Sequence, residues 1–195
     1  IHAKWESLFN NTYNHMTDIC TKGLDLYALV DGKWRFVAPG RPSADGVSTF
    51  TLAKNMTPVD REFMLYLSMY DGVKSIEIGV DKGAYIEQPA VNSPSQKKPI
   101  VMYGSSILQG GCASRPGMAF TNIISRETDR TVFNLGFSGN ALLDMEIAEL
   151  MASVKDPGVF VLDYVPNAKA ERIQEAGEEF FQIIRKAHPD VPIIF

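Results

Sequence analysis

The feature that most constrains the fold of this chain is a change in hydrophobic period near residue 90. Up to about residue 88, apolar residues alternate with polar ones, which is typical of half-buried strands. From residue 100 onward, short apolar runs alternate with segments of helical period. The stretch between them carries three prolines and no apolar period. We therefore expect two domains, 1–88 and 100–195, joined by a linker at 89–99.

The first domain is predicted to be an antiparallel β-sandwich of the jelly-roll-like kind, without a convincing helix. A hairpin is expected over 24–37, where two alternating runs flank Asp31-Gly32. Two further strand-like runs, 63–69 and 76–80, are separated by a turn at Asp71-Gly72. We expect the first strands of this domain to precede the given sequence.

The second domain is predicted to be an α/β, doubly wound parallel sheet, because repeated strand–helix units of this length form such sheets. In the longest expected helix, five apolar residues lie about one turn apart and form a buried stripe: Ile173, Ala176, Phe180, Ile184 and Ala187. The expected strands are 100–103, 131–135, 159–164 and 192–195, with helices near 117–128, 144–154 and 168–187.

The composition limits the classes of molecule that the chain is expected to bind. The net charge is −4 and there is no lysine or arginine stripe, which argues against a nucleic acid or a membrane surface. A small molecule or a neutral polymer fits better. The two cysteines, Cys20 and Cys112, form neither a disulfide framework nor a zinc cluster, and a bridge between them is left open. No apolar run approaches the length of a transmembrane helix.

Three small or polar residues follow the ends of three successive predicted strands: Ser106, Gly139 and Asn167. In a doubly wound sheet these positions face one edge. Acyl transfer from an ester needs a nucleophilic hydroxyl and N–H donors directed at the developing oxyanion. Ser106 can supply the nucleophile and one backbone N–H, Gly139 a second N–H, and Asn167 a side-chain amide.

Each candidate also has a structural interpretation. Ser106 and Asn167 suit helix N-caps, and Gly139 suits a turn. Arg115 can reach a substrate from the first loop, or simply precede a helix that starts with proline.

Four residues of the first domain are interpreted as structural. Asp25 and Tyr27 alternate with leucines, so a plain sheet face explains them. Trp34 and Phe36 are expected in the core rather than in a sugar-binding platform.

At the three strand ends the chain resembles the SGNH/GDSL hydrolase superfamily. The first block of that family, Gly-Asp-Ser-Leu, matches residues 104–107, Gly-Ser-Ser-Ile, with Ser106 as the nucleophile. Its second-block glycine matches Gly139. Its third block, Gly-x-Asn-Asp, matches residues 165–168, Val-Pro-Asn-Ala, of which only Asn167 survives.

Residues 23–27, Gly-Leu-Asp-Leu-Tyr, also look like the GxDLY signature of a domain that precedes a bacterial branch of these hydrolases. Residues 103–117 are similar to the first block of that branch. The resemblance implies a β-sandwich followed by a flavodoxin-like SGNH hydrolase domain, incomplete here. It further implies export, cleavage of esters or carbohydrate acetyl groups, and no metal or organic cofactor.

The fourth block of the superfamily, Asp-x-x-His, carries the general base and is absent from this sequence. The three histidines are His2, His15 and His188, and none follows a suitable aspartate. His188 suits a surface role at a helix end. We expect the base to lie beyond residue 195 and the printed chain to be a poor catalyst.

The leading hypothesis is a serine ester hydrolase acting on a small-molecule or polysaccharide ester. The acyl group is left open between an O-acetyl group, a short-chain lipid ester and a thioester. The alternative is a non-catalytic glycan-binding module with a degenerate hydrolase domain. A phosphate or dinucleotide binder is a third class, but the P-loop lysine and the Rossmann glycine spacing are missing.

Overall fold

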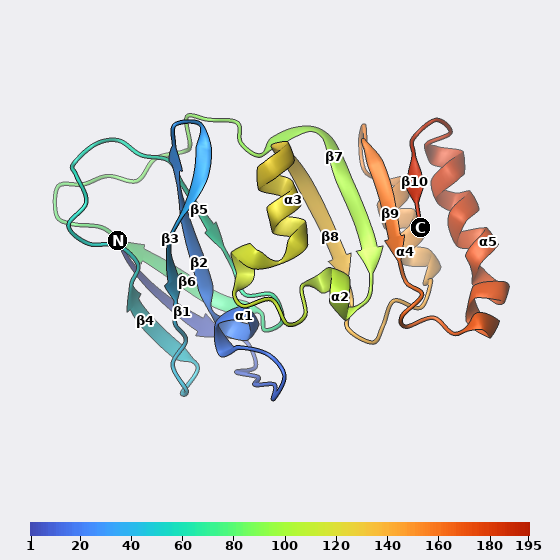
Figure 1. The fold of residues 1–195 in the computed structure, drawn as a ribbon, viewed down its shortest axis with the longest axis horizontal. Helices are drawn as coiled ribbons and strands as arrows, with labels where there is room; N and C mark the ends of the chain where they lie inside the picture. Colours follow the sequence, from blue (N-terminus) through green and yellow to red (C-terminus); the bar gives the residue numbers. More distant parts are fainter. The chain divides into compact units, whose positions relative to one another are not determined.

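The computed structural model describes residues 1–195, except for the side chain of Gln96. The chain forms two compact units (Figure 1). Unit 1 comprises Ile1–Asn92 and Gly111–Arg126, and unit 2 comprises Ser93–Gly110 and Glu127–Phe195. The segment 111–126, which the sequence assigns to the hydrolase domain, therefore groups by its contacts with the N-terminal strands.

Unit 1 is a sandwich of two three-stranded antiparallel sheets, ordered β4-β1-β6 and β3-β2-β5. Trp5 of one sheet and Leu24 and Leu26 of the other are buried in one apolar cluster, so the sheets pack face to face. The strands are β1 His2–Ser7, β2 Leu24–Val30, β3 Lys33–Gly40, β4 Val47–Thr51, β5 Phe63–Tyr66 and β6 Val73–Gly79.

The predicted hairpin is confirmed: β2 pairs with β3 through Asp31 and Gly32, whose φ angles of 50° and 72° suit a two-residue hairpin turn. Asp71-Gly72 does not close a second hairpin, because β5 pairs with β2 whereas β6 pairs with β1. The chain crosses there from one sheet to the other.

Unit 1 also contains helices, one of which the sequence analysis missed. Helix α1, Asp18–Lys22, begins where the Thr17 hydroxyl accepts the backbone N–H of Cys20 at 3.1 Å. Farther along the chain come the 3₁₀ helix η1, Pro116–Met118, and helix α3, Phe120–Thr128. The predicted helix over 117–128 is thus divided in two.

Unit 2 is a parallel sheet with strand order β10-β9-β7-β8. Taken from β8, the strands come in the order second, first, third, fourth along the chain, which is the flavodoxin-like arrangement that was predicted. The elements are β7 Ser95–Gly104, α2 Ser106–Gln109, β8 Arg130–Gly136, α4 Met145–Ala152, β9 Val159–Asp163, α5 Ala170–Ala187 and β10 Ile193–Ile194.

The core of unit 2 lies between the sheet and helices α4 and α5. Tyr103 of β7 and Phe160 of β9 are fully buried there against the predicted stripe of α5, of which Phe180 and Ile184 are at most 1% exposed. The prediction was wrong for Ala187, which is exposed because it is the last residue of the helix. Strand β7 begins at Ser95, inside the stretch predicted as linker, because the backbone N–H of Ser95 already bonds to Asp129.

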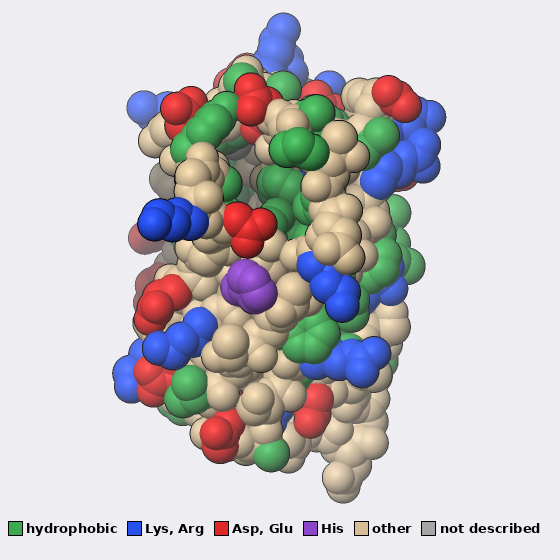
Figure 2. All heavy atoms as spheres, turned by 90° about the vertical axis from the view of Figure 1, so that its left-hand side faces the viewer, with side chains coloured by type: hydrophobic (Ala, Val, Ile, Leu, Met, Phe, Trp, Pro, Cys, Tyr) green, Lys and Arg blue, Asp and Glu red, His purple; other side chains and the backbone are tan. Residues whose placement is uncertain are grey.

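Side chains of both charge signs are interspersed over the face drawn in Figure 2. Exposed ion pairs such as Lys4–Glu77 and Lys74–Glu6 join β1 to β6 and contribute little stability each. None of the described helices is long and apolar enough to cross a membrane. Cys20 and Cys112 are not joined by a disulfide bond; Cys20 is buried and Cys112 is exposed.

Candidate active site

The candidate site lies at the carboxyl ends of β7, β8 and β9. Gly104, the last residue of β7, pairs in register with Gly136 of β8 and Asp163 of β9. The three strands therefore end at one edge, where α2 also lies (Figure 1). The strand order reverses between β7 and β9, and ligands of open α/β sheets bind outside such a reversal point.

Ser106 is the first residue of α2 and is partly exposed. The N-cap is its neighbour Ser105, whose hydroxyl accepts the N–H of Ile107 at 3.3 Å. Ser105 is fully buried, and its own N–H donates to the carbonyl of Asp163 at 3.1 Å. The capping role considered for Ser106 thus belongs to Ser105.

The loop after β8 approaches α2 closely. A Cβ on Gly136 would lie 2.2 Å from the backbone nitrogen of Gln109, so only glycine fits there. The Asn134 amide donates to the Leu108 carbonyl at 3.0 Å, and the N–H of Ser138 donates to Gln109 Oε1 at 2.9 Å. These bonds fix α2 against the second loop.

Gly139 is exposed at the turn of this loop, with φ +73° and open space where a Cβ would stand. Its N–H donates to none of the described groups. The loop is held farther along, where Leu143 N–H donates to the Tyr103 hydroxyl at 2.9 Å and Arg172 Nε donates to the Leu142 carbonyl at 2.7 Å. Gly139 thus presents a free donor on a fixed loop.

Asn167 stands four residues beyond β9. Its Oδ1 accepts the N–H of Ala141 at 3.3 Å, which links the third loop to the second and leaves Nδ2 as a donor without a partner among the described residues. The N-cap of α5 is Lys169, so the capping role considered for Asn167 is not observed.

Asp163 is a site feature that sequence reasoning missed. This carboxyl closes β9 beside Gly104, where a Cβ would come within 2.9 Å of the Asp163 side chain. Burial raises its pKa above the ordinary value for an aspartate. Its position at the end of a buried strand, as an ionisable residue in an apolar run, was the available signal.

Arg115 is held inside unit 1. Its Nε lies 3.1 Å from Oδ2 of Asp25, and its guanidinium lies 4.1 Å from the centre of the Phe36 ring. Asp25 is 0% exposed and also accepts the N–H of Gly117 at 2.9 Å. Asp25 therefore binds the segment 111–126, and the prediction that it lies on a plain sheet face was wrong. Phe36 was predicted in the core but is 45% exposed beneath Arg115.

Of the three histidines, His188 belongs to unit 2, and it lies away from the site. It follows α5, just before β10 begins, and is therefore at the amino ends of the strands. Its Nε2 lies 2.9 Å from the Ala152 carbonyl and its ring packs on Phe160, which is a structural role.

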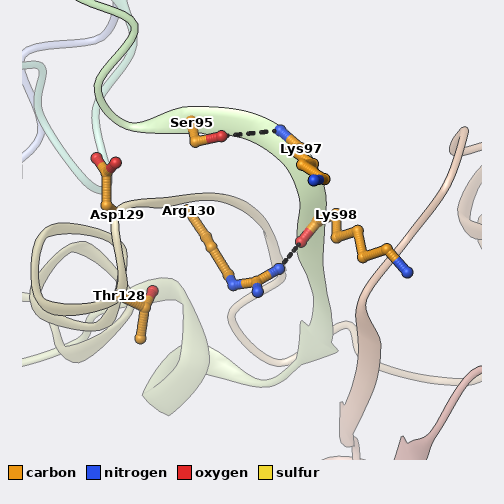
Figure 3. A pocket seen from close by; sticks show the side chains of 6 residues that line it. All are labelled: Ser95, Lys97, Lys98, Thr128, Asp129 and Arg130. Atoms are coloured by element: carbon orange, nitrogen blue, oxygen red, sulfur yellow. Dashed lines mark hydrogen bonds between the residues drawn. The ribbon is translucent and has the colours of Figure 1, made fainter.

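A shallow pocket lies at this opposite edge of the sheet, around the start of β7 and β8 (Figure 3). The Arg130 guanidinium, one of its polar groups, donates to the Lys98 carbonyl at 2.8 Å. The Lys98 side chain points away from Arg130 (Figure 3). This pocket is separate from the strand ends that carry Ser106.

Among the side chains that the structure describes, no group of three or more His, Cys, Asp or Glu is placed to hold a metal ion. What the strand ends do offer is a hydroxyl at a helix start and N–H donors on the neighbouring loops. Such an arrangement is characteristic of hydrolases that use a serine and an oxyanion hole.

Comparison with known proteins agrees with this class. Residues 97–195 match the GDSL-like Lipase/Acylhydrolase family, and residues 1–86 match GxDLY, the N-terminus of Esterase_SGNH_hydro-type. The chain belongs to the GDSL-like lipase/acylhydrolase family and carries the GxDLY domain in front, as the sequence motifs predicted.

Two solved structures extend the comparison. A protein from Bacteroides ovatus ATCC 8483, assigned as a GDSL-like lipase, is 41% identical with a TM-score of 0.91 over 98% of this chain. The salicylyl-acyltransferase SsfX3 from a tetracycline biosynthetic pathway shares the fold, with a TM-score of 0.65 and 18% identity over 98% of this chain. The chain spans 56% and 55% of their respective lengths. Comparison with curated proteins gives no match.

Proposed function

We propose that the protein to which these residues belong is a serine ester hydrolase with Ser106 as its nucleophile. The observation that supports the proposal is that Ser106, Gly139 and Asn167 follow the carboxyl ends of three adjacent strands beside the reversal point of the sheet. The Gly139 N–H and the Asn167 Nδ2 have no partner among the described residues, so both are available to an oxyanion.

In the proposed reaction, Ser106 Oγ attacks the ester carbonyl carbon while a general base takes its proton. The carbonyl π electrons move to oxygen, which the N–H groups of Ser106 and Gly139 and the amide of Asn167 stabilise. Collapse of this intermediate expels the alcohol, which receives the proton, and water then releases the acyl group from Ser106. We propose a histidine outside residues 1–195 as the base.

For the substrate we propose a short acyl ester, with an acetyl group on a carbohydrate as the first class to screen. The strand ends are open: Ile107, next to the nucleophile, is 59% exposed, and Val165, two residues before Asn167, is 66% exposed. Export from the cell is a further part of this proposal and rests on the family resemblance.

The test is labelling of the full-length protein with a fluorophosphonate, followed by mass spectrometry of the peptide that contains Ser106. We expect one adduct on Ser106, abolished in Ser106→Ala and retained in Ser153→Ala, a control at the exposed end of α4. A folded wild-type protein without an adduct would refute the assignment and favour the glycan-binding alternative.

A further inference from the structure

A buried ion pair in unit 1 holds the chain segment that follows the nucleophile helix. Helix α2 ends at Gln109 with Gly110 as its C-cap, the chain enters unit 1 at Gly111, and it returns to unit 2 at Glu127. Only residues 110–114 separate the end of α2 from Arg115, which is paired with Asp25. The anchor is therefore close in sequence to the helix that carries Ser106.

The contacts around Asp25 are specific to this segment. Its Oδ2 accepts the Gly117 N–H at 2.9 Å and forms an ion pair with Nε of Arg115 at 3.1 Å. A Cβ on Gly117 would come within 2.5 Å of both Asp25 and Tyr27, so the backbone fits only as glycine. Nearby, the Thr17 hydroxyl donates to the Ser114 carbonyl at 2.8 Å. The aspartate and tyrosine of the GxDLY motif thus form a seat for residues 114–117.

The seat is not optimised for stability. Asp25 is 0% exposed, yet its Oδ1 has no hydrogen-bond partner among the described residues. Burial raises the pKa of Asp25 to about 6, although Arg115 and the Gly117 N–H act in the opposite direction. A buried carboxylate kept at a net cost is evidence for a role other than stability.

Helix α2 needs an external restraint. It is a single turn, Ser106–Gln109, and a helix of that length is unstable by itself. Its start is fixed through Ser105, and its second half by Asn134, whose amide donates to the Leu108 carbonyl. At its exit the chain runs directly from Gly110, the C-cap of α2, into the segment 111–117.

We propose that Asp25 and Arg115 are positioning residues for the esterase reaction: by fastening the segment after α2 to the GxDLY domain, they hold Ser106 in its reactive orientation. This inference rests on the proposed function of Ser106. It assigns to the N-terminal domain a part in the reaction itself, without contact with substrate.

The test compares Asp25→Asn and Arg115→Lys with wild type in the full-length protein. The measurements are the rate of fluorophosphonate labelling of Ser106, kcat and KM for p-nitrophenyl acetate, and the thermal unfolding midpoint. A displacement of the nucleophile on the order of 1 Å lowers the rate by roughly 100-fold. We expect labelling and kcat to fall at least about tenfold in both variants with KM unchanged, and Asp31→Asn, in an exposed turn, to match wild type.

A double-mutant cycle separates positioning from a general structural effect. If the two residues act as one unit, Arg115→Ala lowers kcat in the wild type but adds little in the Asp25→Asn background. Wild-type labelling rates in Asp25→Asn and Arg115→Lys, or fully additive effects, would overturn the inference while the proposed function stands. If Asp25→Asn does not fold, the labelling rate and kcat of Arg115→Lys decide whether the inference holds. Absence of labelling in the wild type would remove the proposed function and this inference with it.

Discussion

The close contact between Gly136 and Gln109 gives a quantitative test of how the site is built. In Gly136→Ala the new Cβ would lie 2.2 Å from the backbone nitrogen and 2.4 Å from the Cα of Gln109. An ordinary contact needs about 3.5 Å, so the strand end and α2 must separate by more than about 1 Å. Both contacted atoms belong to the backbone, and no side-chain rotation relieves the clash.

The expected cost follows from two contributions. Overpacking in a tight site costs about 1–3 kcal/mol. Separation of α2 from β8 also weakens the bond from Asn134 to Leu108 and the bond from Ser138 to Gln109, each of which contributes about 1 kcal/mol. The total is about 3–5 kcal/mol of lost stability in unit 2.

The matched control is Gly139→Ala, three residues farther along the same loop. It meets no atom within 4 Å, and its cost comes only from the left-handed backbone at φ +73°, about 1–2 kcal/mol. Both variants are compared by urea unfolding. Tryptophan fluorescence follows unit 1, because both tryptophans, Trp5 and Trp34, lie there, while circular dichroism follows both units. Equal stability losses in the two variants would refute the steric reasoning.

Two further predictions concern stability. Gly177→Ala in α5 should raise the free energy of unfolding by about 0.5–1 kcal/mol, because alanine favours helix and its Cβ makes only an ordinary 3.5 Å contact with Ile173. Denaturant unfolding measures this change, and a loss of stability would contradict the prediction. Asp25 has a pKa of about 6 in the folded chain against an ordinary 3.8, so the folded state holds the carboxyl proton more tightly than the unfolded state does. The protonated carboxyl therefore contributes fully to stability below pH 3.8, and this contribution is lost as the pH rises through 6. Relative to Asp25→Asn, wild type should therefore lose up to about 3 kcal/mol between pH 4 and 7, and parallel stability curves for the two proteins would contradict this.

The sequence predicted the fold of unit 2 well, for a physical reason. Buried parallel strands and an amphipathic helix such as α5 leave strong periodic patterns, and short strand–helix connections permit few topologies. Helix α1 was missed because it is five residues long, too short for a period to be visible. The turn at Asp71-Gly72 was predicted, but the crossing from one sheet to the other was not, because a turn signal does not encode which sheet receives the next strand.

The strand-end candidates were accessible from sequence because parallel strands bring their carboxyl ends to one edge. What the sequence left open was whether Ser106 caps the helix or serves as a nucleophile. The structure gives the capping role to Ser105, which separates capping from the proposed catalytic role of Ser106.

The role of Asp25, in contrast, could not be predicted from the sequence. Alternation assigns it correctly to a strand, but a period of two cannot tell an aspartate on a plain sheet face from one that is fully buried under a distant segment. The partners of Asp25, Arg115 and Gly117, lie about 90 residues away in the chain, and no local pattern encodes a contact at that separation. The two motifs, GxDLY at 23–27 and the block at 103–117, were assigned from the family resemblance to two successive domains of the same branch. The structure joins them, because the aspartate of the first motif binds the arginine and the glycine at the end of the second. A motif in the N-terminal domain is thus explained by a loop that begins at the proposed nucleophile helix.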